Sequence, residues 1–263
     1  MKKTTQLGRT GLEVGRLGIS SSFMPPAYAF EEAFEKGCNY FTWGTFIKGR
    51  STAMKRAIQQ IAARGKRENL VLAMYTYAHN RLLTDLFLKK GLKALGTDYT
   101  DVLLLGYYNK MPSRRTLDGA LELKEKGLVR FLGISSHTRS LFPILAREGI
   151  FDVFHIRYNA AHRGAETDIF PKLDLDNRPG IVSFTATRWK RLLSQKRMPP
   201  GETAPTAADC YRFALASPHI DVCMMGAATQ QQMSENLKLL DQPTMTEQEL
   251  ARMRLIGDYQ YKR

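Results

Sequence analysis

The chain has 263 residues, of which 43% are hydrophobic and 24% charged, a composition typical of a globular protein rather than a disordered or collagen-like one. Its formal net charge of +14 favours anionic ligands such as nucleotide phosphates or acidic metabolites. The basic residues are scattered and form no nucleic-acid-binding motif, so a solvated basic surface is the simpler interpretation and we expect no nucleic-acid partner.

Cysteine usage and hydropathy predict the setting of the protein. The three cysteines are Cys38, Cys210 and Cys223; they are far apart and odd in number, so we expect buried thiols rather than disulfides or a metal site. No run approaches the roughly 18 apolar residues of a membrane span, and the basic N-terminus lacks the apolar segment of a secretion signal. We expect a cytoplasmic protein with one domain over residues 1–263, as a monomer or homodimer.

After a turn at residues 9–11, a short apolar strand, a loop, a helix and a glycine follow one another repeatedly. Apolar residues at spacings of three and four predict helices, for example over residues 82–95 and 117–126, and the sequence Thr-Glu-Gln-Glu predicts a capped last helix over 246–261. Glycines suited to a left-handed helix end are Gly37, Gly96, Gly127 and Gly149. The predicted strands are residues 16–20, 39–42, 70–75, 101–105, 129–134, 151–157, 181–185 and 220–225.

The strands and their order predict a parallel barrel. Runs such as DVLLLG are continuously apolar, as in parallel strands covered on both faces. Alternating strands and helices imply right-handed crossovers, and eight such units favour a closed (β/α)8 TIM barrel of α/β class. An open doubly wound sheet is the alternative, but no G-x-G-x-x-G turn follows the first strand.

Five segments, in order, resemble the aldo-keto reductase superfamily across essentially the whole chain. They are LGRTGLEVGRLGIS, LGTDYTDVLLL, LKEKGLVRFLGISSH, YNAAHRGAE and GAATQQQMSENL. The resemblance implies a (β/α)8 barrel with an N-terminal β-hairpin and an extra C-terminal helix. It also implies a nicotinamide cofactor, usually NADP, lying across the C-terminal ends of the strands.

The resemblance also shows where this chain departs from the family. Members use a Tyr as general acid, helped by an Asp and a Lys, with a His that orients the substrate carbonyl. Here Thr42 stands at the Asp position, Phe46 and Ile47 near the Tyr position, Tyr75 at the Lys position and Gly106 at the His position. The standard tetrad is therefore expected to be absent, and this barrel is expected to be a divergent member.

Other side chains at the predicted strand ends are then candidates for the chemistry. Tyr75 and Tyr107 could donate a proton, and Thr42 carries a hydroxyl near the position of the usual acid, although tyrosines are also common as ordinary rim residues. Arg157 could hold a substrate carboxylate or phosphate, or pair with Asp152 or Glu166. The expected pocket residues are Trp43, Phe46, Tyr108 and Arg157.

The cofactor half resembles the family more closely. At the nicotinamide end, the resemblance places Ser135, Ser136 and His137 at the carboxamide and Phe184 against the ring. His155 stands where the family has a Gln with the same duty, and it could equally be a hydrogen-bonded core histidine.

At the phosphate end, Thr185, Ala186 and Arg188 would form the loop over the pyrophosphate. Gly226, Gln232 and Asn236 lie in the last turn near the adenosine. Many NADP-using members have an Arg at the position of Gln232, so NAD is also possible, and Arg188, Lys190 or Arg191 could supply the charge for NADP instead.

The sequence thus predicts an NADP(H)-binding oxidoreductase that acts on an unidentified small carbonyl substrate with a non-standard acid/base site. The alternative is a catalytically degenerate pseudoenzyme that binds a nicotinamide nucleotide as a sensor or scaffold.

Overall fold

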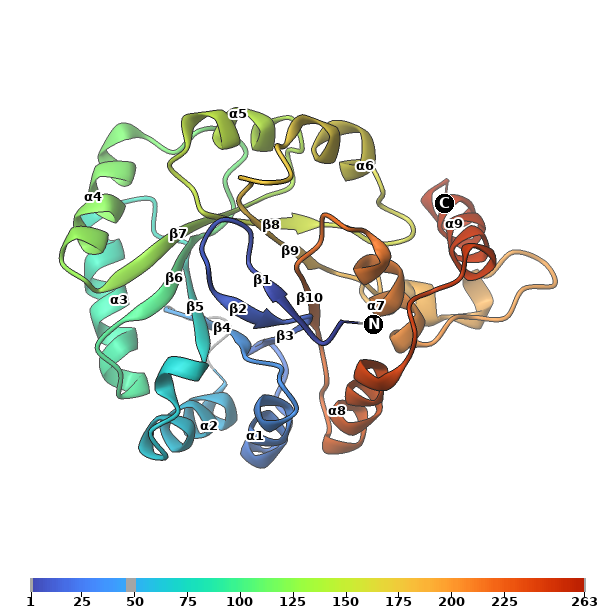
Figure 1. Cartoon of the computed structure of the whole chain (residues 1–263), viewed down its shortest axis with the longest axis horizontal. Helices are drawn as coiled ribbons and strands as arrows, with labels where there is room; N and C mark the ends of the chain where they lie inside the picture. The colour runs from blue at the N-terminus through green and yellow to red at the C-terminus, as the bar shows by residue number, and fades with distance from the viewer. Residues whose placement is uncertain (1, 46–50, 263) are drawn as a thin grey trace.

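A computed structural model, which describes residues 2–45 and 51–262, contains a closed barrel of eight parallel strands (Figure 1). Consecutive strands are neighbours around the barrel, and the last pairs with the first. The barrel prediction is confirmed and the open sheet is excluded. The strands are β3 (Leu17–Ser20), β4 (Tyr40–Gly44), β5 (Val71–Thr76), β6 (Thr100–Leu105), β7 (Val129–Ser136), β8 (Val153–Arg157), β9 (Gly180–Phe184) and β10 (Val222–Met225).

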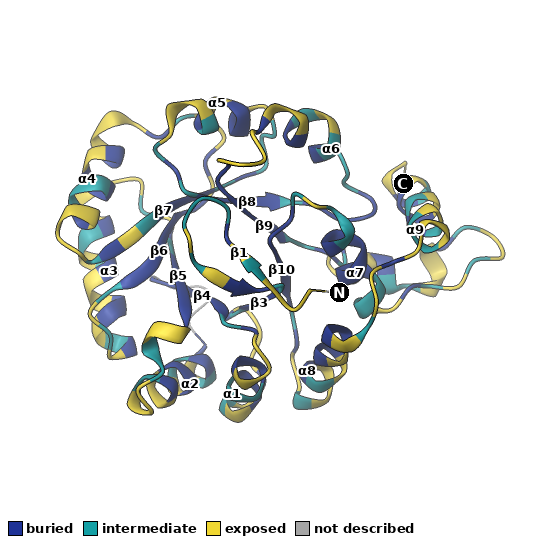
Figure 2. Cartoon of the chain, in the orientation of Figure 1, coloured by how far each residue is buried: buried dark blue, intermediate teal, exposed yellow. Residues whose placement is uncertain are grey.

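Helices surround the barrel, with buried inner faces and exposed outer faces (Figure 2). All four predicted glycine stops have a positive φ, from 68° at Gly96 to 91° at Gly37. Thr246 and Glu249 form the predicted capping box of the last helix, which packs against α7 and η3. The α-helices are α1 (Ala27–Glu35), α2 (Thr52–Ala63), α3 (Arg81–Leu95), α4 (Arg114–Glu125), α5 (Leu141–Glu148), α6 (Ala165–Asp168), α7 (Ala207–Ala216), α8 (Gln230–Leu237) and α9 (Glu247–Tyr261). The 3-10 helices are η1 (Arg67–Asn69), η2 (Phe170–Lys172), η3 (Arg191–Leu193), η4 (Gln195–Arg197) and η5 (Lys238–Asp241).

The core has two layers. A larger outer cluster fills the space between strands and helices, and a smaller inner cluster fills the barrel itself. An antiparallel hairpin, β1 (Thr4–Gln6) and β2 (Glu13–Gly15), lies across the N-terminal ends of the strands (Figure 1). Its neighbouring residues Leu7 and Val14 are fully buried in the inner cluster, so the hairpin closes this end of the barrel, as the family resemblance implies.

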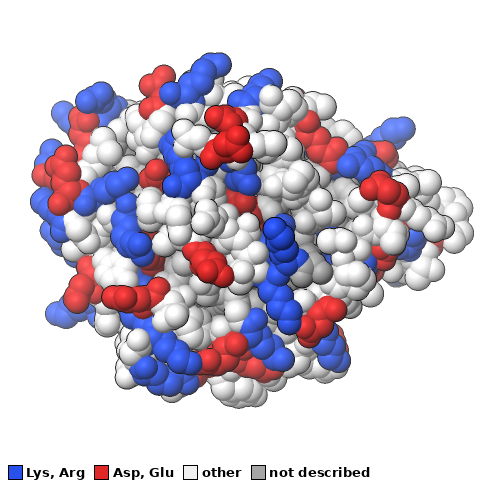
Figure 3. Space-filling model, in the orientation of Figure 1, with Lys and Arg blue, Asp and Glu red and all other residues white. Residues whose placement is uncertain are grey.

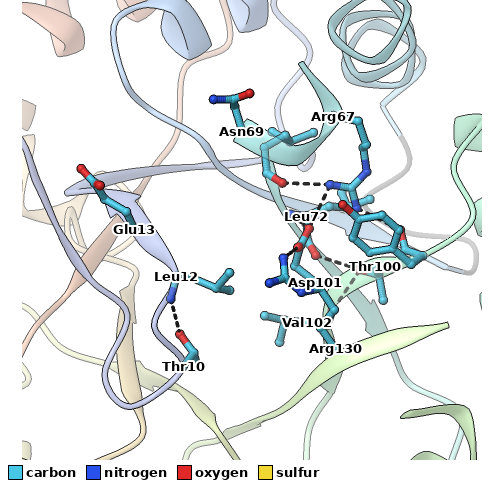
Figure 4. Close-up of polar contacts among 12 residues, drawn as sticks. Thr10, Leu12, Glu13, Arg67, Asn69, Leu72, Thr100, Asp101, Val102 and Arg130 are labelled. Atoms are coloured by element: carbon cyan, nitrogen blue, oxygen red, sulfur yellow. Dashed lines mark hydrogen bonds and ion pairs between the residues drawn. The ribbon is translucent and has the colours of Figure 1, made fainter. Parts of the chain in front are cut away.

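Buried ion pairs fix the N-terminal ends of the strands. The Asp101 carboxylate accepts hydrogen bonds from Arg67 at 3.0 Å, Arg130 at 2.8 Å and the Leu72 amide at 2.9 Å (Figure 4). Arg178 binds Asp221 through two 2.7 Å contacts. Positive and negative side chains are also mixed over this face of the molecule (Figure 3). The N-terminal end is therefore electrostatically balanced and serves to hold the barrel together.

The expectations for cysteines and membrane spans can be compared with the structure. Cys38, Cys210 and Cys223 are all buried free thiols, as predicted, and burial raises the pKa of Cys38 and of Cys223 to about 12. Within residues 2–45 and 51–262, none of the helices combines the length and the hydropathy that crossing a bilayer requires.

Candidate active site

The C-terminal ends of the strands form the mouth of the barrel, where (β/α)8 enzymes carry out their chemistry. Strand alternation determines which side chains face this mouth. On β8, Phe154 and Ile156 belong to the outer cluster and Val153 to the inner one, so His155 and Arg157 face inward. The same alternation on β4 and β5 turns Thr42 and Tyr75 inward.

Tyrosine rings occupy part of the mouth where the family resemblance places the missing tetrad. A Cβ built on Gly106 would lie only 2.7 Å from the ring of Tyr77, so Tyr77 fills the space that a side chain at 106 would need. Tyr77 in turn contacts Tyr75 edge to face, at 5.5 Å between ring centroids. Thr42 is 5% exposed, and its hydroxyl lies 3.5 Å from the Ile19 carbonyl oxygen. The residues that stand at the tetrad positions are therefore packed against their neighbours: Thr42 against the Ile19 carbonyl, and Tyr75 and Gly106 against Tyr77.

Tyr75 is protonated at neutral pH in this setting. Burial, followed by the neighbouring Tyr77, raises the pKa of Tyr75 to about 12, while hydrogen bonds to the Ser21 and Ser22 side chains oppose the shift. No cation is among these influences, in contrast to the Lys of the family pattern. A phenol with a raised pKa can donate a hydrogen bond but is a weaker acid.

A second group at the mouth combines aromatic and basic side chains. His137 lies edge to face between Tyr107, at 5.3 Å, and Phe184, at 5.6 Å, measured between ring centroids. Phe184 is paired in register with Arg157 on the neighbouring strand. Tyr107 is 58% exposed and has a φ of 65°, a left-handed conformation that is uncommon for a side-chain-bearing residue and that is enriched at functional sites.

The electrostatic character of this second group is positive. Burial, and then the charge of Arg157, lowers the pKa of His137. Burial, Arg157, Arg188 and Arg139 together lower the pKa of His162 to about 4. Burial first, and the basic neighbours second, favour the neutral form of both imidazoles at pH 7.

The side chain of Arg157 makes no hydrogen bond or ion pair within the described residues 2–45 and 51–262. The acids that it was expected to pair with are bound elsewhere. Asp152 contacts Lys124 at 3.3 Å, while Glu166 binds Arg254 at 2.8 Å and accepts a 2.7 Å hydrogen bond from the Tyr158 hydroxyl. The pairing alternative for Arg157 is thus wrong.

Two residues expected to line the pocket lie elsewhere. Trp43 is 2% exposed in the outer cluster, facing Gly91 of α3. Tyr108 is also buried in the outer cluster and stacks on His79 at 4.2 Å. Both side chains point away from the mouth because they occupy outward positions, which does not support a role in contacting substrate. Phe46 lies outside the described residues.

The residues predicted to bind the nicotinamide lie at two depths, with Ser135 nearer the surface and His155 buried beneath it. Ser135 is half-buried and pairs in register with His155, while the Ser136 hydroxyl accepts a 2.9 Å hydrogen bond from the Thr138 amide and shapes the turn. His155 Nε2 lies 2.8 Å from the Tyr40 hydroxyl, and burial lowers the pKa of His155 to about 3. His155 is therefore a neutral, hydrogen-bonded histidine beneath the mouth, as in the core alternative.

The predicted phosphate loop contains a run of unusual backbone conformations. Thr185 has a φ of 59°, and Arg188, Trp189 and Lys190 have φ values from 50° to 67°. Ala186 is buried in the outer cluster. The Arg188 guanidinium donates a 2.6 Å hydrogen bond to the Gln260 carbonyl oxygen at the end of α9, so it anchors the loop to that helix.

This loop borders a basic cavity of about 380 Å³. Four of the six lining residues are basic and none is acidic. The lining residues are Arg188, Arg191, Ser194, Lys196, Arg197 and Gln260. Of the three residues expected to supply positive charge, Arg188 and Arg191 line this cavity, and Lys196 and Arg197 add to it.

The last strand–helix turn is stabilised by its own side chains. Asn236 donates a 3.3 Å hydrogen bond to the Gly226 carbonyl oxygen, and Gln232 Oε1 accepts a 2.9 Å hydrogen bond from the Ala228 amide. A Cβ on Gly226 would lie 2.4 Å from the Phe23 ring. These contacts give Gln232 and Asn236 a role in shaping the turn, and neither adds charge to the site.

The sequence matches no family model and no curated protein. Solved structures do match the barrel and its hairpin. The holo form of aldo-keto reductase AKR11C1 from Bacillus halodurans has a TM-score of 0.78 and 19% identity, covering 96% of this chain and 95% of that chain. The chain has the aldo-keto reductase fold. The apo form of the same protein gives a TM-score of 0.77 and 21% identity, with the same coverage.

Within this aldo-keto reductase fold, the sequence interpretation missed His162 and the basic cavity. His162 lies in the loop after β8 and reaches the mouth only through the fold, so no local pattern indicates it. The cavity did have a signal, because the stretch KRLLSQKR contains four basic residues in eight. The charge of this stretch alone does not show that its side chains line a cavity.

Proposed function

We propose that this chain is an NADP(H)-binding oxidoreductase of aldo-keto reductase type, which acts in the cytoplasm on a small carbonyl substrate with a rebuilt acid/base site. The observation that carries the proposal is the arrangement of Tyr107, His137, Phe184 and Arg157 at the mouth, beside the loop that borders the basic cavity. The aromatic group would suit the nicotinamide, and the basic cavity would suit the phosphates, because the loop that follows Phe184 leads from one to the other.

The residues present fit such a cofactor. His137 Nδ1 is buried and has no hydrogen-bond partner among the residues that the structure describes, so it is free to bind a carboxamide together with Ser135. Phe184 offers a ring at the same level. Arg191, Lys196 and Arg197 of the basic cavity would hold the phosphates, because charge-assisted contacts with phosphate oxygens are strong. The extra phosphate of NADP would also depend on this cavity, since Gln232 is neutral.

When bound in reduced form, the nicotinamide supplies a hydride to the carbonyl carbon of the substrate. The carbonyl oxygen then takes up the electron pair of the broken π bond and needs a proton from the protein or solvent. Tyr107 is our choice for this proton, because its phenol is exposed beside His137, whereas the raised pKa of Tyr75 makes that residue a poorer acid. Thr42 is bonded within the strand layer, which leaves it a packing role.

Cofactor binding is tested by titrating the purified protein with NADPH and with NADH while following nicotinamide fluorescence. We expect a shift or quenching that saturates, and weaker binding in Phe184→Ala. Phe131→Ala is the matched control, because Phe131 is a partly buried aromatic of the inner layer at the opposite end of the barrel. No binding at about millimolar nucleotide, which corresponds to only about 4 kcal/mol of affinity, would contradict the proposal.

A catalytically degenerate nucleotide-binding protein is the second candidate, and the filled space above Gly106 favours it. Single-turnover reactions of bound NADPH with aldehydes, quinones and oxo acids discriminate between the two. Hydride transfer that is lost in Tyr107→Phe, with unchanged NADPH affinity, would support the enzyme. Nucleotide binding without any hydride transfer would support the degenerate protein.

A further inference from the structure

The mouth of this barrel contains an arginine without a counterion. Arg157 ends β8 and faces inward, and its side chain has no hydrogen bond or ion pair within residues 2–45 and 51–262. The other basic groups around it are engaged. Arg139 binds Asp168 at 2.6 Å, and Arg188 is bonded to the end of α9.

The surroundings of Arg157 leave its charge unbalanced. Burial, and then the charge of Arg157, lowers the pKa of His137 and of His162, so neither imidazole balances the charge of Arg157 at pH 7. The aromatic residues Tyr107 and Phe184 complete the group. A half-buried guanidinium among rings and neutral imidazoles gains most from a planar oxyanion that accepts two of its hydrogen bonds.

We infer that the substrate is a small carbonyl compound that carries a carboxylate, and that Arg157 binds this carboxylate. As a statement about substrate, the inference rests on the proposed reductase function. The guanidinium fork matches carboxylates and phosphates alike, but the single charge of Arg157 balances a carboxylate and leaves a phosphate dianion only partly neutralised. Several cationic side chains are gathered instead in the basic cavity beyond Arg188. The two kinds of anion would therefore be bound at separate places.

The experiment compares binding of phenylglyoxylate, its methyl ester and phenyl phosphate by isothermal titration calorimetry. The ester keeps the ring and the reactive carbonyl but removes the charge. Measurements are made on the full chain alone and with NADP⁺, so that no turnover occurs. Failure of NADP⁺ binding would contradict the proposed function, while binding of the acid to the chain alone still tests Arg157.

We expect the acid to bind at least about tenfold more tightly than the ester, and Arg157→Gln to lose about that factor. Arg115→Gln is the control, because it removes the same charge from the exposed outer side of α4 and should leave binding unchanged. Equal affinity for acid and ester in the unmodified protein would overturn the inference without any variant. So would unchanged binding in Arg157→Gln, or tighter binding of phenyl phosphate than of the acid.

Discussion

Replacing the buried His155 by Gln should make the protein less sensitive to mild acid. Burial lowers the pKa of His155 from 6.5 to about 3, so the folded chain keeps this imidazole neutral while the unfolded chain protonates it below about pH 6.5. The unfolded state then binds more protons than the folded state. The stability that depends on neutral His155 is therefore complete above pH 6.5 and is lost progressively as the pH falls toward 3.

The size of the effect follows from the pKa difference. Each pH unit within this window costs about 1.4 kcal/mol, so this one side chain lowers the free energy of unfolding by about 2 kcal/mol between pH 6.5 and 5.0. Gln at this position does not titrate. Its hydrogen bond to the Tyr40 hydroxyl, which His155 Nε2 now makes at 2.8 Å, can be retained by the amide.

Urea unfolding of the unmodified protein and of His155→Gln at pH 7.0, 6.0 and 5.0 measures this difference. Between pH 7.0 and 5.0 the unmodified protein should lose about 2 kcal/mol more than the variant, with more than half of this loss below pH 6.0. His219→Gln is the comparison variant. Burial, and then Arg178, also lowers the pKa of His219, but this ring is only partly buried, stacked on Phe170, so removing it should change the pH slope less than removing His155 does. The same pH slope in His155→Gln as in the unmodified protein would refute the reasoning.

Three further substitutions test the packing described above by urea unfolding at pH 7. Asp221→Asn should destabilise the protein by about 3–5 kcal/mol, because it leaves the buried Arg178 charge without its partner. Its control is Asp118→Asn, in an exposed pair with Arg114, which should cost less than about 1 kcal/mol. Similar losses in both variants would contradict the assigned role of burial. Thr246→Ala removes the capping box of α9 and should cost about 1 kcal/mol, and an unchanged unfolding free energy would show that the cap is dispensable. Gly106→Ala should be destabilising with Tyr77 present and much less so in Tyr77→Ala, since the new methyl meets that ring at 2.7 Å; a coupling energy below about 0.5 kcal/mol would count against the contact.

The strands and the barrel could be predicted from the sequence because each β/α unit has a strong local signal. Continuous apolar runs such as residues 101–105 indicate strands covered on both sides, and glycines such as Gly96 mark helix ends through their positive φ. Every predicted strand overlaps an observed one. The N-terminal hairpin was predicted from the family resemblance, and the last helix from its capping box.

The facing of individual side chains at the mouth could not be predicted in the same way. All five residues of β4 are buried, so the alternation that would distinguish Trp43 from Thr42 is absent from the sequence. Tyr108 was predicted to line the pocket, but the left-handed Tyr107 directly before it changes the direction of the chain, and the sequence does not indicate this turn. The anchoring of Arg188 depends on Gln260, 72 residues away, and no local pattern contains such a contact.

The hairpin across the N-terminal ends has a consequence for the traffic of ligands. Leu7 and Val14 join the inner cluster that fills the barrel, so nothing passes through the barrel from that side. Nucleotide and substrate would then both enter through the mouth at the C-terminal ends of the strands. Whichever of the two binds deeper in the mouth must bind first and be released last. Steady-state kinetics of the proposed reductase would identify the deeper ligand, because a compulsory order in which the nucleotide binds first and leaves last would place it beneath the substrate.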